Sequence, residues 1–208
     1  MTEPGPGLSQ EIVHSSWHGA SLTAPAGACP WRDDSSTVGR SEWVTDKPEE
    51  NAVPRIVPNL WFDDQALEAA EFYVSIFPNS KITTVTHYTE VGPGPEGEVL
   101  TVDFELDGQK ITGINGGPLF TFSEAVSLLI EAADQNEIDH YWEKLTDGGE
   151  ESQCGWLKDR YGFSWQVVPK GWEALYTDPD TEKVNRVMTA MLQMKKLDIA
   201  ALEAAAGA

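Results

Sequence analysis

The sequence is short of three things: cysteine, basic side chains and long apolar runs. Its two cysteines, Cys29 and Cys154, allow at most one disulfide, and we expect both thiols to be reduced, as in a cytoplasmic protein. No apolar run approaches the roughly 20 residues that cross a bilayer. The first residues have neither the basic start nor the apolar stretch of a secretory signal. These shortages predict a cytoplasmic protein with no membrane partner.

Basic residues are outnumbered, since 34 acidic side chains stand against 14 basic ones and the formal net charge is −20. A surface of this charge repels phosphate backbones and anionic headgroups. The composition therefore argues against nucleic acid as a partner, and we interpret the acidity as a source of solubility rather than as a binding function.

Residues 1–53 differ from the rest of the chain. They are rich in Pro, Gly, Ser and Thr and show no sustained hydrophobic periodicity, so we predict an irregular N-terminal extension. Three tryptophans are unusual in such a segment, and the sequence leaves open whether they pack on the following domain or on a neighbouring subunit: Trp17, Trp31 and Trp43.

From residue 54 the pattern becomes regular. Residues 55–62 are typical of a strand, with Pro58 at an edge or bulge. Asp63 and Asp64 then favour the start of a helix that ends near Phe77. Three strands are predicted after it, the last two joined by the hairpin turn Asp107-Gly108: residues 81–90, 98–106 and 109–115.

The same order of elements then begins again. We predict a strand over 125–132, a helix over 137–145, and strands over 153–158 and 162–168, with little room for a third strand after the helix. A final amphipathic helix is predicted over 180–204. The predicted fold is α+β, with paired βαβββ modules over 54–121 and 122–169, because two such modules can close their apolar faces over a shared core.

Three segments resemble the PhnB-like branch of the vicinal oxygen chelate (glyoxalase/bleomycin-resistance/dioxygenase) superfamily, a branch labelled 3-demethylubiquinone-9 3-methyltransferase. The most specific is residues 114–169, where NGGP, DQ-x-E-x-D-x-YW and CGWLKD-x-YG-x-SWQ occur in order. The others are IVPNLWFDDQALEAAEFYVSIFPNSKI (56–82) and AMLQMKKLDIAALEAA (190–205). The resemblance covers about three quarters of the chain and implies the paired-module fold and a homodimer.

The resemblance also implies where a metal would be held. Metal-dependent members take ligands, commonly His or Gln and Glu, from the first and fourth strands of each module. On that pattern the positions here fall at Ile56 or Asn59, Asn115, Ser127 and Gln166. An aliphatic side chain and neutral donors, without carboxylate or imidazole, make a poor site for a divalent cation. We therefore predict no metal and no cofactor.

The candidate pocket residues are Asn59, Trp61, Asn115, Ser127, Cys154 and Gln166. The amides of Asn115 and Gln166 can hydrogen-bond a neutral ligand, or they are satisfied inside the core, and the sequence favours neither. Cys154 is a candidate nucleophile, but it lies on a predicted strand rather than at a helix N-terminus, which favours a buried structural thiol. Aromatic residues such as Trp61 suit a flat or apolar ligand.

Residues 92–97, GPGPEG, have the formal spacing of a dinucleotide-binding motif. A nucleotide or S-adenosylmethionine site needs a strand, a glycine turn and then a helix, whereas a strand is predicted after this segment. We interpret it as a hairpin loop that can cover a pocket, and the methyltransferase label as a mislabel.

The sequence thus favours a metal-independent protein that binds a small molecule of aromatic or apolar character. Three alternatives stay open: a metal-dependent lyase, isomerase or dioxygenase, the labelled methyltransferase, and a dimeric interaction protein without a ligand. The sequence does not decide whether any reaction is catalysed.

Overall fold

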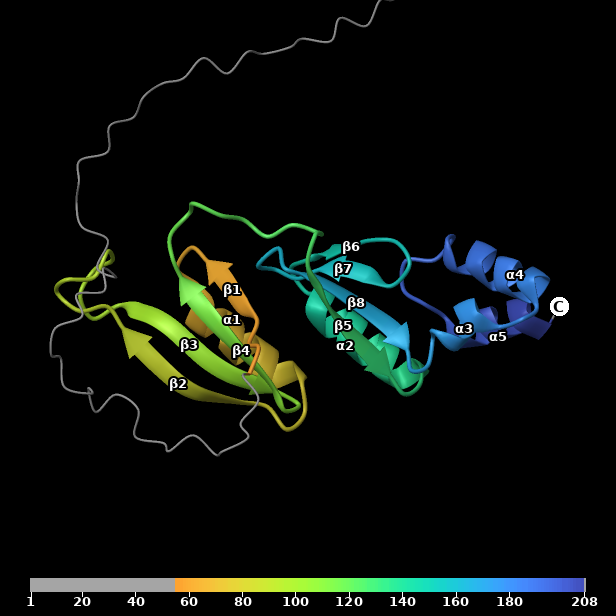
Figure 1. Ribbon diagram of the computed structural model, residues 1–208, viewed down its shortest axis with the longest axis horizontal. Coiled ribbons are helices and arrows are strands. Elements are labelled where there is room, and N and C mark those ends of the chain that lie inside the picture. Colours follow the sequence, from red (N-terminus) through yellow and green to blue (C-terminus); the bar gives the residue numbers. More distant parts are fainter. Residues whose placement is uncertain (1–54, 208) are drawn as a thin grey trace, which may run out of the picture. The chain divides into compact units, whose positions relative to one another are not determined.

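The structure, a computed structural model, describes residues 55–207 and contains two βαβββ modules (Figure 1). Module one consists of β1 (Asn59–Phe62), α1 (Ala66–Ile76), β2 (Lys81–His87), β3 (Val99–Leu106) and β4 (Gln109–Asn115). Module two consists of β5 (Ser127–Ala132), α2 (Gln135–Thr146), β6 (Glu150–Glu151), β7 (Trp156–Lys158) and β8 (Ser164–Pro169). The predicted paired-module fold is confirmed. The predicted irregular extension over residues 1–53 lies outside the described residues.

Each module forms its own four-stranded sheet with the same strand order. The orders are β1-β4-β3-β2 and β5-β8-β7-β6, so that the first strand of each module runs parallel to the last one and the remaining pairs are antiparallel. Pro58 precedes the edge strand β1. At this position the sheet does not need a hydrogen bond from its backbone nitrogen, which carries no hydrogen. The predicted turn at Asp107-Gly108 is present, and both residues have positive φ, 44° and 85°.

Helix α1 begins at Ala66, later than the predicted cap at Asp63 or Asp64. Gln65 occupies the cap position and makes no side-chain cap bond. The first helical N–H, that of Ala66, is instead bonded by Asn115 Oδ1 at 2.8 Å. The difference has a tertiary cause, because the cap comes from strand β4, 49 residues further along the chain.

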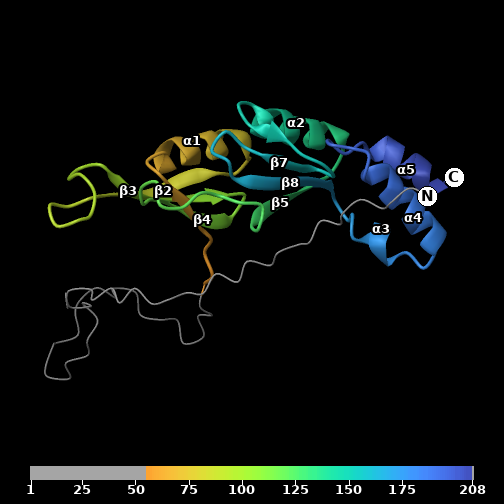
Figure 2. The same ribbon diagram turned by 90° about the horizontal axis from the view of Figure 1, so that it is seen from above.

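One hydrophobic core runs through both modules. Helices α1 and α2 lie on the same side of the two sheets (Figure 2). Tyr73 of α1 packs edge-on against Trp165 of β8, with ring centroids 5.4 Å apart. Phe77 stacks on both Tyr141 and Trp165, at 5.2 and 5.5 Å. Because these pairs cross from one module to the other, the modules share a single packed interior.

A buried carboxylate, that of Asp159, ties this core together. Only 2% of the residue is exposed. Its Oδ2 accepts hydrogen bonds from Tyr73 Oη at 2.7 Å and Trp165 Nε1 at 2.8 Å, and its Oδ1 accepts from the backbone N–H groups of Tyr161 and Phe163. Tyr73 belongs to module one and the other donors to module two. Burial raises the pKa of Asp159, and the two side-chain donors and two backbone donors offset only part of this effect.

The segment after β8 differs from the single helix predicted over 180–204. It forms α3 (Ala174–Thr177), α4 (Thr181–Met191) and α5 (Ile199–Gly207). The helix is interrupted because backbone carbonyls between α4 and α5 are used elsewhere: Met194 O and Lys195 O accept from the N–H groups of Cys154 and Gly155, both at 2.8 Å. Asp198 then starts α5 by accepting from Ala201 N at 2.9 Å.

Across residues 55–207, none of the helices is both long and apolar enough to cross a bilayer.

We expect Asp159→Asn to lower the free energy of unfolding by about 1–3 kcal/mol, because the amide nitrogen cannot accept from the neutral donors that surround the carboxylate. Urea unfolding at neutral pH measures the change. The matched control is Asp147→Asn, which removes an ion pair to Arg160 from a side chain that is 74% exposed. This control should cost less than about 1 kcal/mol, and equal losses in both variants would contradict the assigned role of Asp159.

The stability difference between wild type and Asp159→Asn should depend on pH. Burial raises the folded-state pKa of Asp159 above its unfolded value, so between these two values the folded protein binds more protons than the unfolded chain. Stability from this group therefore rises as pH falls through the window and is lost as pH rises. Urea unfolding between about pH 4 and 7 should show the difference widening toward acid. A difference that narrows toward acid would mean that the four donors outweigh burial.

Candidate functional site

A large cleft lies beside α1 in module one. Its volume is about 1150 Å³, and it is bounded by the first half of α1, the loop between β2 and β3, and the segment just after β4. Apolar and polar side chains both line it: Trp61, Asp63, Asp64, Leu67, Glu68, Glu71, Tyr88, Glu98, Val99, Leu100, Ile114 and Asn115. A concave hollow of this size is the default place for a small-molecule site.

Trp61 forms a fixed aromatic wall of this cleft. Its Nε1 donates to the backbone oxygen of Gly117 at 2.9 Å, and its ring meets Phe120 edge-on at 5.0 Å. Gly116 lies directly against the indole, where any Cβ would collide with the ring. The glycine therefore permits the close approach that holds the indole in place.

The loop between β2 and β3 forms the opposite wall. Tyr88 Oη donates a hydrogen bond to the backbone oxygen of Asn115 and so ties the start of the loop to β4. Gly94 lies against the Tyr88 ring, in a space that a side chain would fill. Pro93, Gly94 and Pro95 all line the cleft. The predicted hairpin loop is thus present, and β3 follows it, so no helix N-terminus stands behind the GPGPEG segment to receive a phosphate or carboxylate.

The cleft is strongly acidic. Five carboxylates line it and no lysine or arginine does: Asp63, Asp64, Glu68, Glu71 and Glu98. Glu68 accepts a hydrogen bond from Tyr161 Oη at 2.9 Å. Partial burial, with this carboxylate as the next cause, raises the pKa of Tyr161 well above its ordinary value, so the phenol stays protonated. Such a lining attracts cations, tolerates neutral molecules and repels anions.

Asn115, one of the predicted pocket residues, is engaged within the fold. Gly113 faces α1, since a Cβ there would touch Ala66, and strand alternation puts Asn115 on the same side. Asn115 is 7% exposed. Its Oδ1 caps α1 at Ala66 N, and its Nδ2 donates to Val99 O at 3.1 Å. The side chain thus borders the cleft while its amide bonds hold α1, β3 and β4 together.

Ser127 and Gln166 lie on the other side of their sheet. Trp165 points toward the helices and packs on Tyr73, so its neighbour Gln166 faces away from them, on what we call the open face of module two. Gln166 Nε2 donates to Ser127 Oγ at 2.9 Å. Gln166 and Asn115 therefore face opposite sides of the layer of sheets, and they cannot serve as the floor of one shared pocket.

Cys154 lies in a tight turn before β7. Its φ of 58° is in the left-handed region, and its thiol donates to Met191 O at 3.6 Å. Together with Gln166 it lines a smaller cavity beneath the C-terminal helices. Asn59, the remaining predicted residue, is exposed, and its amide donates to Val57 O at 2.9 Å. Of the six predicted residues, Trp61 and Asn115 thus line the cleft, Cys154 and Gln166 line the small cavity, and Asn59 and Ser127 line neither.

At the strand positions that hold a metal in relatives, the side chains of this chain do not suit a divalent metal ion. Facing away from the helices, β1 offers Asn59 and Trp61, β4 offers Ile114, and β5 and β8 offer Ser127 and Gln166. Ile56 precedes β1 and is 92% exposed. These side chains supply no carboxylate and no imidazole. Within residues 55–207, no three or more His, Cys, Asp or Glu side chains are grouped to hold an ion.

Several residues that line the cleft or the small cavity were not predicted from the sequence. Tyr88 and Glu98 flank the β2–β3 loop, and Trp172 lies in the segment between β8 and α3. The proline-glycine loop was a usable signal for the first two, because a long loop between strands commonly borders a site. No local sequence pattern predicts that Trp172 lines a cavity, because the other lining residues lie up to 30 positions away along the chain.

Comparison with known proteins identifies relatives of this fold. A family model described as 3-demethylubiquinone-9 3-methyltransferase matches residues 54–168. A PhnB protein from Bacillus cereus is 36% identical, with a TM-score of 0.52 over 56% of this chain and 99% of that one. Its similarity and the matched family confirm the vicinal oxygen chelate fold.

Two further structures are more distant. Protein PA1353 from Pseudomonas aeruginosa is 16% identical over 57% of this chain and 98% of that one, with a TM-score of 0.49. The fosfomycin resistance protein FosX from Listeria monocytogenes, complexed with Mn(II) and sulfate, is 16% identical over 61% of this chain and 98% of that one, with a TM-score of 0.42. No curated protein matches the chain.

Two asparagines of module one offer a paired test of this geometry. We expect Asn115→Ala to lower the free energy of unfolding by about 1–3 kcal/mol, since it leaves Ala66 N–H and Val99 O without their partner. Asn59→Ala, which removes an exposed local bond, should change it by less than about 0.5 kcal/mol. Urea unfolding measures both. Similar small effects would show that α1 does not need its cap from β4.

Proposed function

This chain belongs to the family described as 3-demethylubiquinone-9 3-methyltransferase, and we propose that it acts as a small-molecule-binding protein that needs no metal ion. The proposed site is the cleft of module one. The observation that carries the proposal is the combination of a fixed indole, that of Trp61, with an acidic lining that contains no basic residue. The expected ligand has a flat apolar part and is neutral or positively charged.

The aromatic wall favours a flat ligand for an energetic reason. Trp61 is held by its bond to Gly117 and by Phe120, so the ring loses little freedom when a ligand stacks on it. Leu67, Leu100 and Ile114 add apolar surface to the same cleft. A planar molecule that covers the indole gains apolar burial, and a cationic one also gains attraction to the ring face.

The charge of the cleft selects against anions. A carboxylate or phosphate ligand would meet five acidic side chains and no compensating lysine or arginine. A cation would neutralise part of this charge, and a neutral molecule would avoid the penalty. We therefore expect the aromatic or apolar ligand predicted from the sequence to be neutral or positively charged.

The enzymatic alternatives find less support in this geometry. Metal chemistry needs several oxygen or imidazole donors that converge on one ion, whereas the strand positions that hold a metal in relatives offer Asn59, Trp61, Ile114, Ser127 and Gln166 here. The methyltransferase reaction in the family description needs a site for a methyl donor, and the GPGPEG segment lies between two strands. Both observations favour binding without metal-dependent chemistry.

We further propose a cytoplasmic homodimer. Its support is a set of large apolar side chains left exposed on the segment between the modules and on β5: Leu119, Phe120, Val126 and Leu129, at 74, 59, 65 and 41% exposure. Apolar side chains gathered on connected segments commonly mark a contact surface. The low cysteine content supports the reducing compartment.

The ligand class can be tested with three probes of similar shape, namely N-methylquinolinium, 2-naphthol and 2-naphthoate. Calorimetry on the full chain after treatment with EDTA should show binding of the cation and of the neutral probe, and at least about tenfold weaker binding of the anion. Trp61→Ala should weaken the first two by about tenfold or more, since it removes the stacking surface. Trp172→Phe, remote from the cleft, is the matched control and should leave them unchanged.

Metal dependence is tested in the same experiment. Adding Mn²⁺, Zn²⁺ or Ni²⁺ should alter the affinities by less than about twofold, because the strand positions that hold a metal in relatives provide no anionic ligand here. Protein purified without chelator should contain no stoichiometric transition metal. Binding that appears only after a metal is restored would refute the proposal.

A paired substitution tests the dimer. Val126→Glu and Leu129→Glu place charges in the exposed apolar set, and light scattering should show the full chain shifting from dimer to monomer. Lys81→Glu, on the distant edge strand β2, is the control and should leave the dimer intact. A wild-type monomer at micromolar concentration would contradict the proposed assembly.

A further inference from the structure

We propose a second ligand site, separate from the cleft, in the small cavity between the open face of module two and helices α3 to α5. It would take a neutral molecule with a single aromatic ring and one hydrogen-bond acceptor. The proposal does not rest on the proposed function, because it concerns other residues and another ligand.

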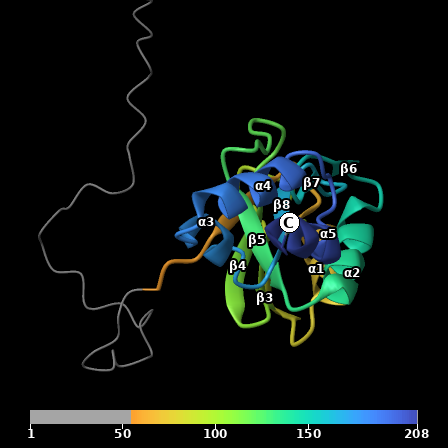
Figure 3. The same cartoon turned by 90° about the vertical axis from the view of Figure 1, so that its right-hand side faces the viewer.

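The C-terminal helices form a cover over the end of module two. Figure 3 shows α3, α4 and α5 grouped next to β5 and β8. Val168 of β8 packs with the helices in a core of its own, distinct from the core shared by the modules. The buried members on the helical segment are Val187, Leu197 and Leu202. A packed cover of this kind shields part of the open face from water.

Polar contacts hold the cover in one position on the sheet. Cys154 N and Gly155 N donate to Met194 O and Lys195 O, both at 2.8 Å. The side-chain amide of Gln135 in α2 binds the backbone at the start of α5. Its Nε2 donates to Leu197 O at 3.1 Å, and its Oε1 accepts from Ile199 N at 2.9 Å.

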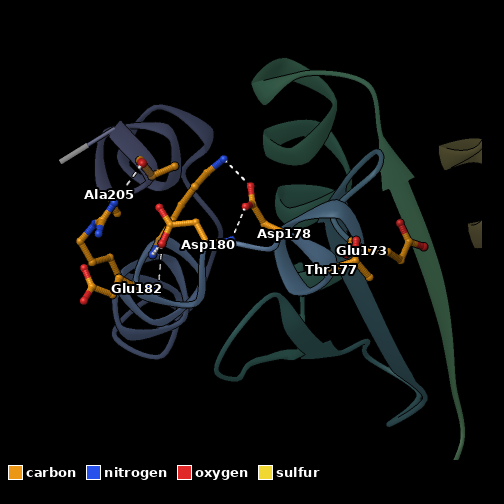
Figure 4. A network of polar contacts seen from close by, with 9 residues as sticks. Glu173, Thr177, Asp178, Asp180, Glu182 and Ala205 are labelled. Carbon is orange, nitrogen blue, oxygen red and sulfur yellow. Dashed lines mark hydrogen bonds and ion pairs between the residues drawn. The ribbon is translucent and has the colours of Figure 1, made fainter.

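Further contacts join the helices to one another (Figure 4). Asp180 caps α4 by accepting from the N–H groups of Glu182 and Lys183, both at 3.1 Å. Asp178 forms an ion pair with Lys183 at 2.6 Å. Arg186 of α4 donates to the backbone oxygen of Ala205 in α5 at 3.1 Å. Because the cover is fastened at several points, the space beneath it does not close by a simple shift of one helix.

The cavity has the size of one aromatic ring. Its volume is about 160 Å³, close to the roughly 150 Å³ of an engineered apolar cavity that binds benzene. No charged side chain lines it: the lining is Cys154, Trp156, Gln166, Val168, Pro169, Trp172, Leu175, Tyr176, Met191, Leu197 and Leu202. A neutral and mainly apolar ligand suits such walls, because a buried charge would be left unpaired.

One donor in the lining is unused. Among the described residues, Trp172 Nε1 is buried and has no hydrogen-bond partner. Three other polar groups of the lining are engaged: the Cys154 thiol with Met191 O, Gln166 Nε2 with Ser127 Oγ, and Tyr176 Oη with Met191 Sδ. A buried donor without an acceptor is unfavourable. A ligand whose acceptor meets the indole N–H would remove this penalty, which is why the proposed class carries one acceptor.

The test compares two probes that differ in the acceptor, acetophenone and ethylbenzene. Binding to the full chain is measured by protein-observed NMR titration, followed on the signals of the residues that line the small cavity. We expect both to bind wild type. Trp172→Phe keeps the ring beside Tyr176 and removes the N–H, so it should weaken acetophenone by about threefold or more and leave ethylbenzene nearly unchanged.

Two further variants locate the site. Met191→Trp should fill the cavity and abolish binding of both probes, and Leu197→Phe serves the same purpose if the first variant does not fold by circular dichroism. Trp61→Ala, in the cleft of module one, should leave both affinities unchanged. This variant separates the two proposals, since it removes the aromatic wall of the cleft and leaves the lining of the cavity unchanged.

Four outcomes would overturn the inference. The first is no binding of either probe at concentrations on the order of 1 mM. The second is equal weakening of both probes by Trp172→Phe, which would mean that the indole N–H takes no part. The third is loss of binding in Trp61→Ala, which would place the probes in the cleft. The fourth is undiminished binding in a folded cavity-filling variant.

Discussion

The buried carboxylate of Asp159 is the interaction on which the arrangement of the two modules depends. It accepts from Tyr73 of α1 and from Trp165 of β8, and it orders its own turn through the N–H groups of Tyr161 and Phe163. The aromatic packing between the modules follows from this fixed point, because Phe77 and Tyr73 can meet Trp165 only when α1 lies beside β8. Burying this carboxylate is costly, and its neutral donors would be left without an acceptor in any other arrangement, so the group favours one docking geometry of the modules.

With the modules docked, strand alternation decides what each side of the sheets can do. The helix side receives large apolar residues and the cap that Asn115 supplies to α1. The open side receives Trp61, Ser127 and Gln166. Because alternation puts Asn115 and Gln166 on opposite faces, the two amides do not occupy equivalent positions in the two repeats and lie in different surroundings. One borders an acidic cleft, and the other lies beneath the C-terminal helices.

The two modules therefore share a fold and differ in what covers them. In module one the β2–β3 loop borders an open cleft of about 1150 Å³, whose carboxylates set its preference by charge. In module two, α3 to α5 cover about 160 Å³ that no charged residue lines, so shape and the buried, unpartnered indole N–H of Trp172 set the preference. The repeated strands and helices position both sites. The β2–β3 loop and helices α3 to α5, which lie outside the repeated strands, determine the charge and size of each site, as is common for loops and terminal extensions.

The sequence alone determined the order of elements in module one, the strand and helix that open module two, and the Asp107-Gly108 turn, whereas the short strand β6 was not predicted. These features are local, since they depend on periodicity, turn residues and the identity of single side chains. Tertiary structure alone decided the cap of α1, the break between α4 and α5, and the separation of six predicted pocket residues into different places. Each of these depends on a partner distant in sequence, as Ala66 depends on Asn115 and Cys154 on Met194. A local pattern cannot contain such a partner, because the chain must fold before the two groups meet.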